Sequence, residues 1–136
     1  MFLLDTDVIS ALRRPDRLSP EVTAWAESAD ADQFYISAIS ILEIEQGVLA
    51  KERVDPVTGE ILRAWFRSDV LQAFADRIIA VDTEVAMRCA ALHVPDLQSE
   101  RDGLIAATAL VHSMAIVTRN ISDFEKTGVA LLNPWI

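Results

Sequence analysis

Four acidic residues lie either just after a predicted strand or in the first turns of a predicted helix. They are Asp5, Glu43, Asp102 and Asp123. Carboxylates gathered in one place repel one another and raise each other's pKa values. A divalent cation removes that conflict, and an all-oxygen ligand set suits Mg²⁺ or Mn²⁺ rather than Zn²⁺ or copper. The pattern predicts a hard-metal site, provided that the fold brings the four side chains together.

The elements that must position these acids follow from the hydrophobic pattern. Short apolar runs predict strands at 2–4, 34–37, 77–81, 115–118 and, as a fifth, 129–132. Apolar residues at helical spacing predict helices at 7–14, 20–29, 38–52, 57–76, 83–93 and 102–113. Strands that alternate with amphipathic helices are typical of an α/β fold with a doubly wound parallel sheet.

The predicted elements place the four acids at one edge of that sheet. Asp5 directly follows the first strand, and Asp123 comes shortly after the fourth. Glu43 lies in the first turns after the second strand, and Asp102 begins the helix that leads into the fourth. Ligands of such sheets bind beyond the carboxyl ends of the strands. These acids are therefore the first candidates for chemistry.

Each acid also has a purely structural interpretation. Glu43 and Asp102 each follow a serine by three residues, as the last residue of a helix-capping box does. Asp7 is expected to cap the first helix, and Asp123 fits an Asx-turn. Four separate caps need not converge on one sheet edge, so the shared position favours a site. A capping role also does not exclude metal ligation.

Composition excludes several classes of protein. The chain of 136 residues has the length of one domain, and its single cysteine, Cys89, excludes an internal disulfide framework. No basic segment precedes the apolar N-terminal residues and no apolar run approaches the length of a membrane span. We therefore expect a cytoplasmic protein. The 51% hydrophobic content predicts apolar surface at an interface, and the net charge of −9, taken alone, argues against nucleic acid as a partner.

Four segments carry a resemblance that covers nearly the whole chain. They are LLDTDVIS (3–10), ISILEIEQGV (39–48), RDGLIAATALVHSMAIVTRNISDF (101–124) and LLNPWI (131–136). In order and spacing they resemble the PIN-domain ribonucleases, and among these the VapC-type toxins of type II VapBC toxin–antitoxin pairs. The long third segment is the most specific of the four.

The resemblance implies a single PIN domain over residues 1–136. It implies a three-layer α/β/α sandwich around a parallel sheet of four or five strands. It also implies an endoribonuclease that hydrolyses RNA phosphodiester bonds with Mg²⁺ or Mn²⁺. Matched position by position, the catalytic and metal-binding acids of the family fall on the four residues already singled out, namely Asp5, Glu43, Asp102 and Asp123.

Residues that support the site follow from the same match. Thr6, Thr118 and Asn120 fall on supporting positions, and Arg119 and Arg101 are near enough in sequence to hold the RNA backbone or to pair with surplus acids. Asp7 departs from the family, which usually has asparagine there, and either caps the helix, which we expect, or adds a metal ligand.

The resemblance further implies partners. A cognate VapB-like antitoxin would cover the acidic cleft, with the helical stretch 38–76 supplying much of the contact, and the toxin would be a homodimer that assembles further with the antitoxin. Transfer, ribosomal and messenger RNA all remain open as substrates.

Two other functions fit part of the sequence. A haloacid-dehalogenase-type phosphatase also opens with Asp-x-Asp after a strand, as Asp5 and Asp7 do, but the chain after Thr118 is too short for its later lysine and acidic pair. A receiver-like regulatory module also binds Mg²⁺ with acids at a sheet edge. Asp82 is a poor match for its phosphoacceptor, and the last strand is not followed by the lysine that it needs.

Overall fold

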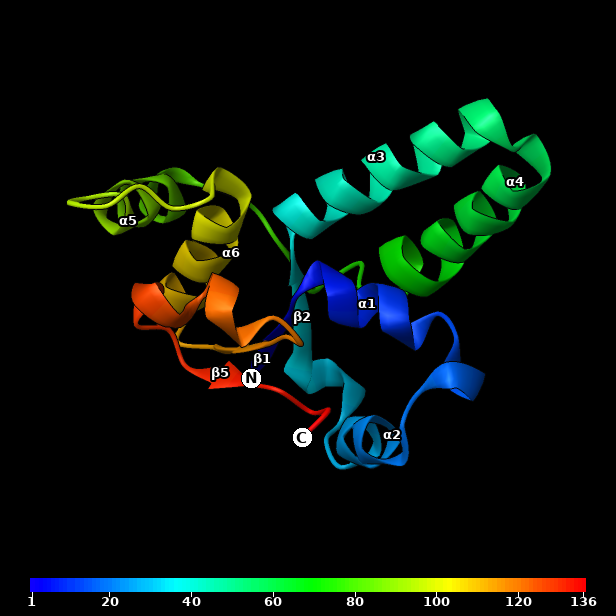
Figure 1. Cartoon of the computed structure of the whole chain (residues 1–136), viewed down its shortest axis with the longest axis horizontal. Coiled ribbons are helices and arrows are strands. Elements are labelled where there is room, and N and C mark those ends of the chain that lie inside the picture. Colours follow the sequence, from blue (N-terminus) through cyan, green and yellow to red (C-terminus); the bar gives the residue numbers. More distant parts are fainter.

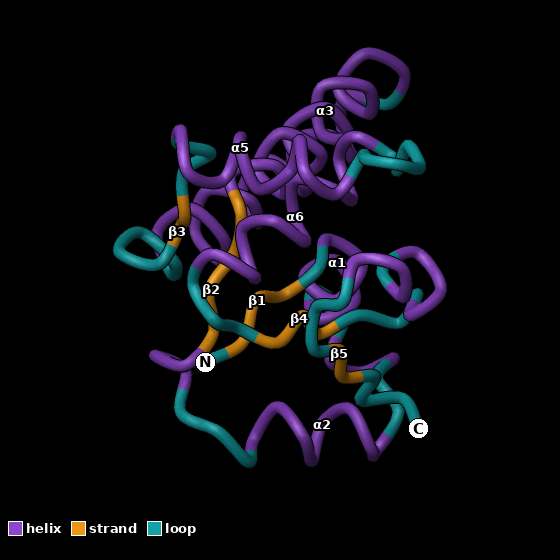
Figure 2. The backbone as a smooth tube through the Cα atoms, turned by 90° about the vertical axis from the view of Figure 1, so that its left-hand side faces the viewer, coloured by secondary structure: helices purple, strands orange, loops and turns teal.

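Five short parallel strands form the centre of the molecule. A computed structural model describes all residues, 1–136, and gives the strands as β1 (Phe2–Leu4), β2 (Phe34–Ser37), β3 (Ile78–Ile79), β4 (Ala115–Val117) and β5 (Leu131–Leu132). They lie side by side in the order β3-β2-β1-β4-β5 (Figure 2). The register pairs Leu3 with Tyr35 on one side and with Ile116 on the other. The predicted parallel sheet is confirmed.

Six α-helices connect and cover these strands. They are α1 (Thr6–Leu12), α2 (Pro20–Glu27), α3 (Ala38–Val54), α4 (Pro56–Trp65), α5 (Thr83–Leu92) and α6 (Glu100–Val111). The stretch predicted as one helix over 57–76 is instead α4 followed by a π-helical segment, Phe66–Gln72. None of the helices combines the length and the apolar character that a membrane-spanning segment requires.

Alternation along the strands divides the core into two halves. Leu3 and Ile116 point to one face of the sheet, where they pack with α6 residues such as Ile105. Leu4 and Val117 point to the opposite face, where they join a cluster with α1, α3 and the π-helical segment. Successive strand residues face opposite sides, so two apolar residues in a row require helices on both sides. The predicted three-layer α/β/α sandwich is confirmed.

Helix α3 begins earlier than the capping-box interpretation requires. Ser37 is its N-cap, and its hydroxyl accepts a hydrogen bond from the backbone N–H of Ile39 at 3.0 Å. Ser40 lies inside the first turn and is fully buried. The capping box of Ser40 with Glu43 is therefore wrong, and both side chains are free to face the sheet edge.

Helices α3 and α4 form a hairpin that extends from one end of the molecule (Figure 1). Gly59 permits their close approach, because a Cβ at that position would stand 2.6 Å from the Cα of Glu52. Arg63 of α4 bridges the two helices through ion pairs to Glu45 and Glu52 of α3. These contacts fix α4 against α3, and Glu43 near the start of α3 is hydrogen bonded to Thr6, which follows β1.

The strand order places a switch point next to β1. From β1 the chain winds outward to β2 and β3, and then crosses back to β4 on the other side of β1. Connections leave β1 and β4 in opposite directions, which opens a crevice at their carboxyl ends. Asp5 and Thr118 are the first residues beyond these two ends.

Candidate functional site

Asp5 is held on both of its carboxylate oxygens. It is the N-cap of α1, and its Oδ1 accepts a hydrogen bond from the backbone N–H of Thr6 at 2.8 Å. The hydroxyl of Thr118 donates to Oδ2 at 2.9 Å. Thr118 is fully buried and itself accepts a bond from the backbone N–H of Asn120 at 2.9 Å. Strand ends β1 and β4 thus fix one carboxylate between them.

The surroundings of Asp5 disfavour its negative charge. Burial, with only 8% of the residue exposed, is the main cause that raises its pKa to about 7, and the nearby charges of Asp7 and Asp102 add to it. The hydrogen bonds from Thr118 and Thr6 act in the opposite direction but do not offset burial. A buried carboxylate with a raised pKa is the kind of group that a bound cation stabilises in its ionised form.

Asp7 does not cap helix α1, so that expectation was wrong. Its Oδ2 accepts hydrogen bonds from the backbone N–H of Arg119 at 3.2 Å and from Nδ2 of Asn120 at 3.1 Å. Its Oδ1 is buried and has no hydrogen-bond partner. Burial raises the pKa of Asp7. The carboxylate therefore ties the loop after β4 to α1 and leaves one oxygen without a partner.

Glu43 reaches the same edge from α3. The Thr6 hydroxyl lies 2.8 Å from Glu43 Oε1 and 2.8 Å from the Ser40 hydroxyl. A guanidinium nitrogen of Arg101 stands 3.8 Å from Glu43 Oε2, and another donates to Gln46 at 2.9 Å. Arg101 thus pairs with a site acid, which is one of the two roles expected for it.

Asp102 and Asp123 complete the acidic edge from the other side. Burial raises the pKa of Asp102, and the charges of Asp123 and Glu43 raise it further. Asp102 also contributes to the raised pKa of Asp5. Asp123 ends the 3₁₀ turn Ile121–Asp123 that follows β4. The charges of Asp123 and Glu43 thus act on Asp102, and the charge of Asp102 acts on Asp5, which links the four acids predicted from the sequence.

The donor set fits a hard divalent cation by its chemistry. Every candidate ligand is a carboxylate oxygen, burial and like charges raise the pKa values of Asp5 and Asp102, and Asp7 Oδ1 is buried without a partner. As the side chains stand, no group of three or more acidic, histidine or cysteine side chains is close enough to hold an ion. The acids share an edge without forming a closed cage, and repulsion between unneutralised carboxylates opposes a tighter arrangement.

Arg119 is directed away from these acids. Its guanidinium stacks over the ring of Trp135 at 5.1 Å, and its backbone carbonyl accepts a 3.4 Å hydrogen bond from Asn133. The backbone N–H of Arg119, rather than its charge, contacts the site through Asp7. Asn120 lies between Thr118 and Asp7, with its backbone N–H donating to the Thr118 hydroxyl and its side-chain amide donating to Asp7.

Sequence reasoning missed two members of this edge. Ser40 was assigned to a cap but lies against Thr6, and Asp7 was assigned to a cap but binds the loop after β4. Ser40 precedes Glu43 by one helical turn, a spacing that puts both on one face of a helix and could have revealed it. No comparable sequence signal connects Asp7 to Asn120, 113 residues away.

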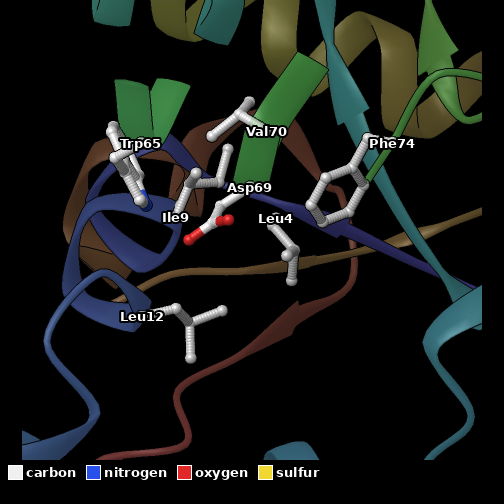
Figure 3. A pocket seen from close by; sticks show the side chains of 7 residues that line it. All are labelled: Leu4, Ile9, Leu12, Trp65, Asp69, Val70 and Phe74. Atoms are coloured by element: carbon white, nitrogen blue, oxygen red, sulfur yellow. The ribbon is translucent and has the colours of Figure 1, made fainter. Parts of the chain in front are cut away.

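Two cavities lie near α1, and only one adjoins the acids. The first, of about 100 Å³, is lined by apolar side chains around the carboxylate of Asp69 (Figure 3). The second, of about 280 Å³, lies between α1, α3 and α4 and shares Thr6 and Glu43 with the acidic edge. The second cavity is therefore the one that a substrate at the site could enter.

Comparisons with known proteins agree with this architecture. Toxin FitB of Neisseria gonorrhoeae is 35% identical over 99% of both chains, and VapC ribonuclease Y4jK of Sinorhizobium fredii is 34% identical over 99% of this chain and 98% of that one. The crystal structure of FitAcB from Neisseria gonorrhoeae superposes with a TM-score of 0.86 at 35% identity, covering 99% of each chain. The PIN domain family matches residues 2–129. The chain therefore belongs to the PIN domain family.

Proposed function

We propose that this protein is a Mg²⁺- or Mn²⁺-dependent endoribonuclease and the toxin of a type II toxin–antitoxin pair. The observation that carries the proposal is the acidic edge at the switch point, where burial and neighbouring acids, Glu43 and Asp123 among them, raise the pKa values of Asp5 and Asp102. Membership of the PIN family and the names of its relatives, a VapC ribonuclease and a toxin, support it. We further propose that residues 1–136 form one such domain.

The four acids would hold the metal in this proposal. Asp5, Asp102 and Asp123 are the principal ligands, and Glu43 completes the set directly or through water. A divalent ion bound there supplies an activated water and neutralises charge on the phosphate. Hydrolysis that breaks the bond between phosphorus and the 3′ oxygen would leave a 5′-phosphate on one RNA product and a 3′-hydroxyl on the other.

The other residues of the edge position these acids. The Thr118 hydroxyl and the Thr6 N–H fix the two oxygens of Asp5, and the Thr6 hydroxyl orients Glu43. Asp7 and Asn120 hold the loop that carries Asp123 against α1. Arg101, already beside Glu43, is the cation best placed to meet the RNA backbone.

The antitoxin partner is supported by apolar surface on the α3–α4 hairpin. Leu49, Val54, Val57 and Ile61 are each more than half exposed there. Exposed apolar side chains on one hairpin are typical of a surface that another protein covers. We propose that a VapB-like antitoxin binds this hairpin and closes the acidic edge, and that the toxin forms a homodimer.

Cleavage of RNA by the purified protein tests the proposed activity. We expect cleavage in Mg²⁺ or Mn²⁺, no cleavage in EDTA, and a loss of at least about a hundredfold in rate for Asp102→Asn. Asp96→Asn, the same change at an exposed position before α6, is the matched control and should cleave as the wild type does. Undiminished cleavage in EDTA would contradict the metal-dependent mechanism.

The two alternative activities have direct assays. Hydrolysis of a simple aryl phosphate would reveal a phosphatase, and transfer of phosphate from acetyl phosphate to the protein would reveal a receiver-like module. The comparisons favour neither, since the family match covers residues 2–129 with the PIN domain.

A further inference from the structure

The cavity between α1, α3 and α4 opens directly beside the acidic edge. Its volume is about 280 Å³, just below the ~300–1,000 Å³ of typical small-molecule sites. Thr6 and Glu43 line it and are also hydrogen bonded to each other at 2.8 Å. One wall of the cavity is therefore part of the site itself, and a group of the size of a single nucleobase suits the space.

Gly47 lines this cavity, and packing within the chain does not explain why a glycine is there. Three glycines lie inside helices. A Cβ would stand 2.6 Å from the Cα of Glu52 at Gly59 and 3.2 Å from a ring nitrogen of His93 at Gly103. At Gly47 a Cβ would meet nothing within 4 Å. Glycine is unfavourable inside a helix, so the residue is best explained by the space that it leaves in the cavity.

The side chains around that space suit a nucleotide. Trp65 and Leu62 line it from α4, and Ser10 and Arg13 line it from α1. Unpaired bases of RNA stack on aromatic side chains, and arginine binds phosphate through paired hydrogen bonds. The ion pairs of the molecule involve Arg63, Arg77 and Arg101, so Arg13 has no acidic partner.

We infer that this cavity, the Gly47 pocket, receives a base of the RNA strand next to the phosphodiester bond that is cut. The inference rests on the proposed function and gives the proposed ribonuclease a pocket that selects which RNA bonds are cut. Trp65 stacks on the base, Arg13 holds its phosphate, and the absence of a side chain at Gly47 admits it. The occupant is a nucleotide rather than a protein side chain because the pocket shares Thr6 and Glu43 with the cleavage site and adds a free cation to an aromatic wall.

Cleavage mapping provides the first test. Gly47→Val fills the pocket, and we expect the rate of RNA cleavage to fall about tenfold or more and the set of cleaved bonds to change. Ala50→Val places the same side chain on an exposed position of α3 outside the pocket and should match the wild type. Gly47→Ala, which favours the helix, provides a variant that folds and should show an intermediate loss.

Nucleotide binding provides a test that does not need cleavage. The four nucleoside 5′-monophosphates, without divalent metal, are titrated into the labelled protein while the indole N–H signal of Trp65 is followed by NMR. At least one should shift that signal in the wild type and in Ala50→Val, and the shift should be reduced in Gly47→Ala and absent in Gly47→Val.

The outcomes separate this inference from the proposed function. If the protein cleaves no RNA but a nucleotide still shifts the Trp65 signal, the pocket inference holds and the proposed ribonuclease activity is refuted. Unchanged cleavage rate and unchanged bonds in Gly47→Val overturn the pocket and leave the ribonuclease intact. The pocket inference is also overturned if no nucleotide shifts the Trp65 signal. It is likewise overturned if Gly47→Val cleaves RNA as the wild type does and loses only its affinity for a neutralising protein.

Discussion

Acidic residues have opposite surroundings at the acidic edge and on the α3–α4 hairpin. On the hairpin, Glu45 and Glu52 both pair with Arg63, and that arginine lowers the pKa of Glu52. At the edge, burial and neighbouring acids raise the pKa values of Asp5 and Asp102, and one oxygen of Asp7 has no partner. The hairpin carries its own cation, whereas Asp5, Asp7 and Asp102 at the edge form no ion pair and leave room for a cation from outside. Carboxylates without an internal counter-ion therefore distinguish a site from a structural ion pair.

Exchanging one carboxylate in each region is expected to give the largest contrast. Asp5→Asn should reduce metal-dependent RNA cleavage by about a thousandfold, because it removes a charge held on both oxygens at the switch point. Glu45→Gln on the hairpin should leave the rate within about twofold of the wild type. Initial rates at saturating metal measure both. Equal losses in the two variants would remove the distinction.

The pH dependence of the unfolding free energy is expected to give the second-largest difference between the two regions. The pKa of Asp5 is about 7 in the folded protein and near its ordinary value, 3.8, when unfolded. The folded state therefore binds the proton more tightly, so its stabilising effect is complete below about pH 4 and is lost as the pH rises towards 7. The predicted loss of unfolding free energy across that window is at most about 4 kcal/mol.

Denaturation in EDTA at several pH values measures this loss. Asp5→Asn should reduce the slope between pH 5 and 7, since its amide does not titrate, and Mg²⁺ should restore stability to the wild type at pH 8. A wild type as stable at pH 8 as at pH 5 in EDTA would show that Asp5 is not strained by its surroundings.

Packing of the hairpin is expected to have an intermediate effect. Gly59→Ala places a Cβ 2.6 Å from backbone of α3, so the two helices must separate, which costs about 1–3 kcal/mol. Urea denaturation measures the loss. A gain in stability, as helix propensity alone predicts, would show that the helices are not in tight contact there.

The ion pairs of the hairpin are expected to have the smallest effect. Arg63→Gln should lower the melting temperature by no more than a few degrees, and added salt should shrink the difference because the carboxylates of Glu45 and Glu52 are partly exposed to solvent. Thermal melts at low and high salt measure it. RNA cleavage should be unchanged, in contrast to the variants at the edge.

Local sequence signals predicted most of the elements but not all of their ends. Ser19 was correctly identified as the N-cap of α2, whereas the capping box that Ser40 and Glu43 fit does not form, because Ser37 caps α3. Ser37 and Ser40 both lie near the start of α3, and the residue at which β2 ends decides which of them caps the helix. The stretch after Trp65 keeps helical spacing and buries Phe66 and Val70 as an α-helix would, so the sequence pattern does not reveal that it forms a π-helical segment.

The candidate site was predictable where its residues follow strands. Asp5 and Thr118 come directly after apolar runs, so the general geometry of parallel sheets brings them to one edge. Asp7 and Arg101 could not be placed in this way. Asp7 binds Asn120 and Arg101 pairs with Glu43, and both partners are far away in sequence. From the sequence alone, Asp7 is indistinguishable from a helix cap and Arg101 from a surface cation.

The sequence by itself determined which residues are apolar, how they alternate, and hence that a parallel sheet with acids at its strand ends would form. Hydrophobic periodicity is a local property, so it can be read without coordinates. The tertiary structure alone decided which charges meet: Arg63 with two glutamates, Arg101 with Glu43, Arg119 with Trp135, and Arg13 with no acid. Electrostatic energy depends on distance and burial, and only the folded chain sets these.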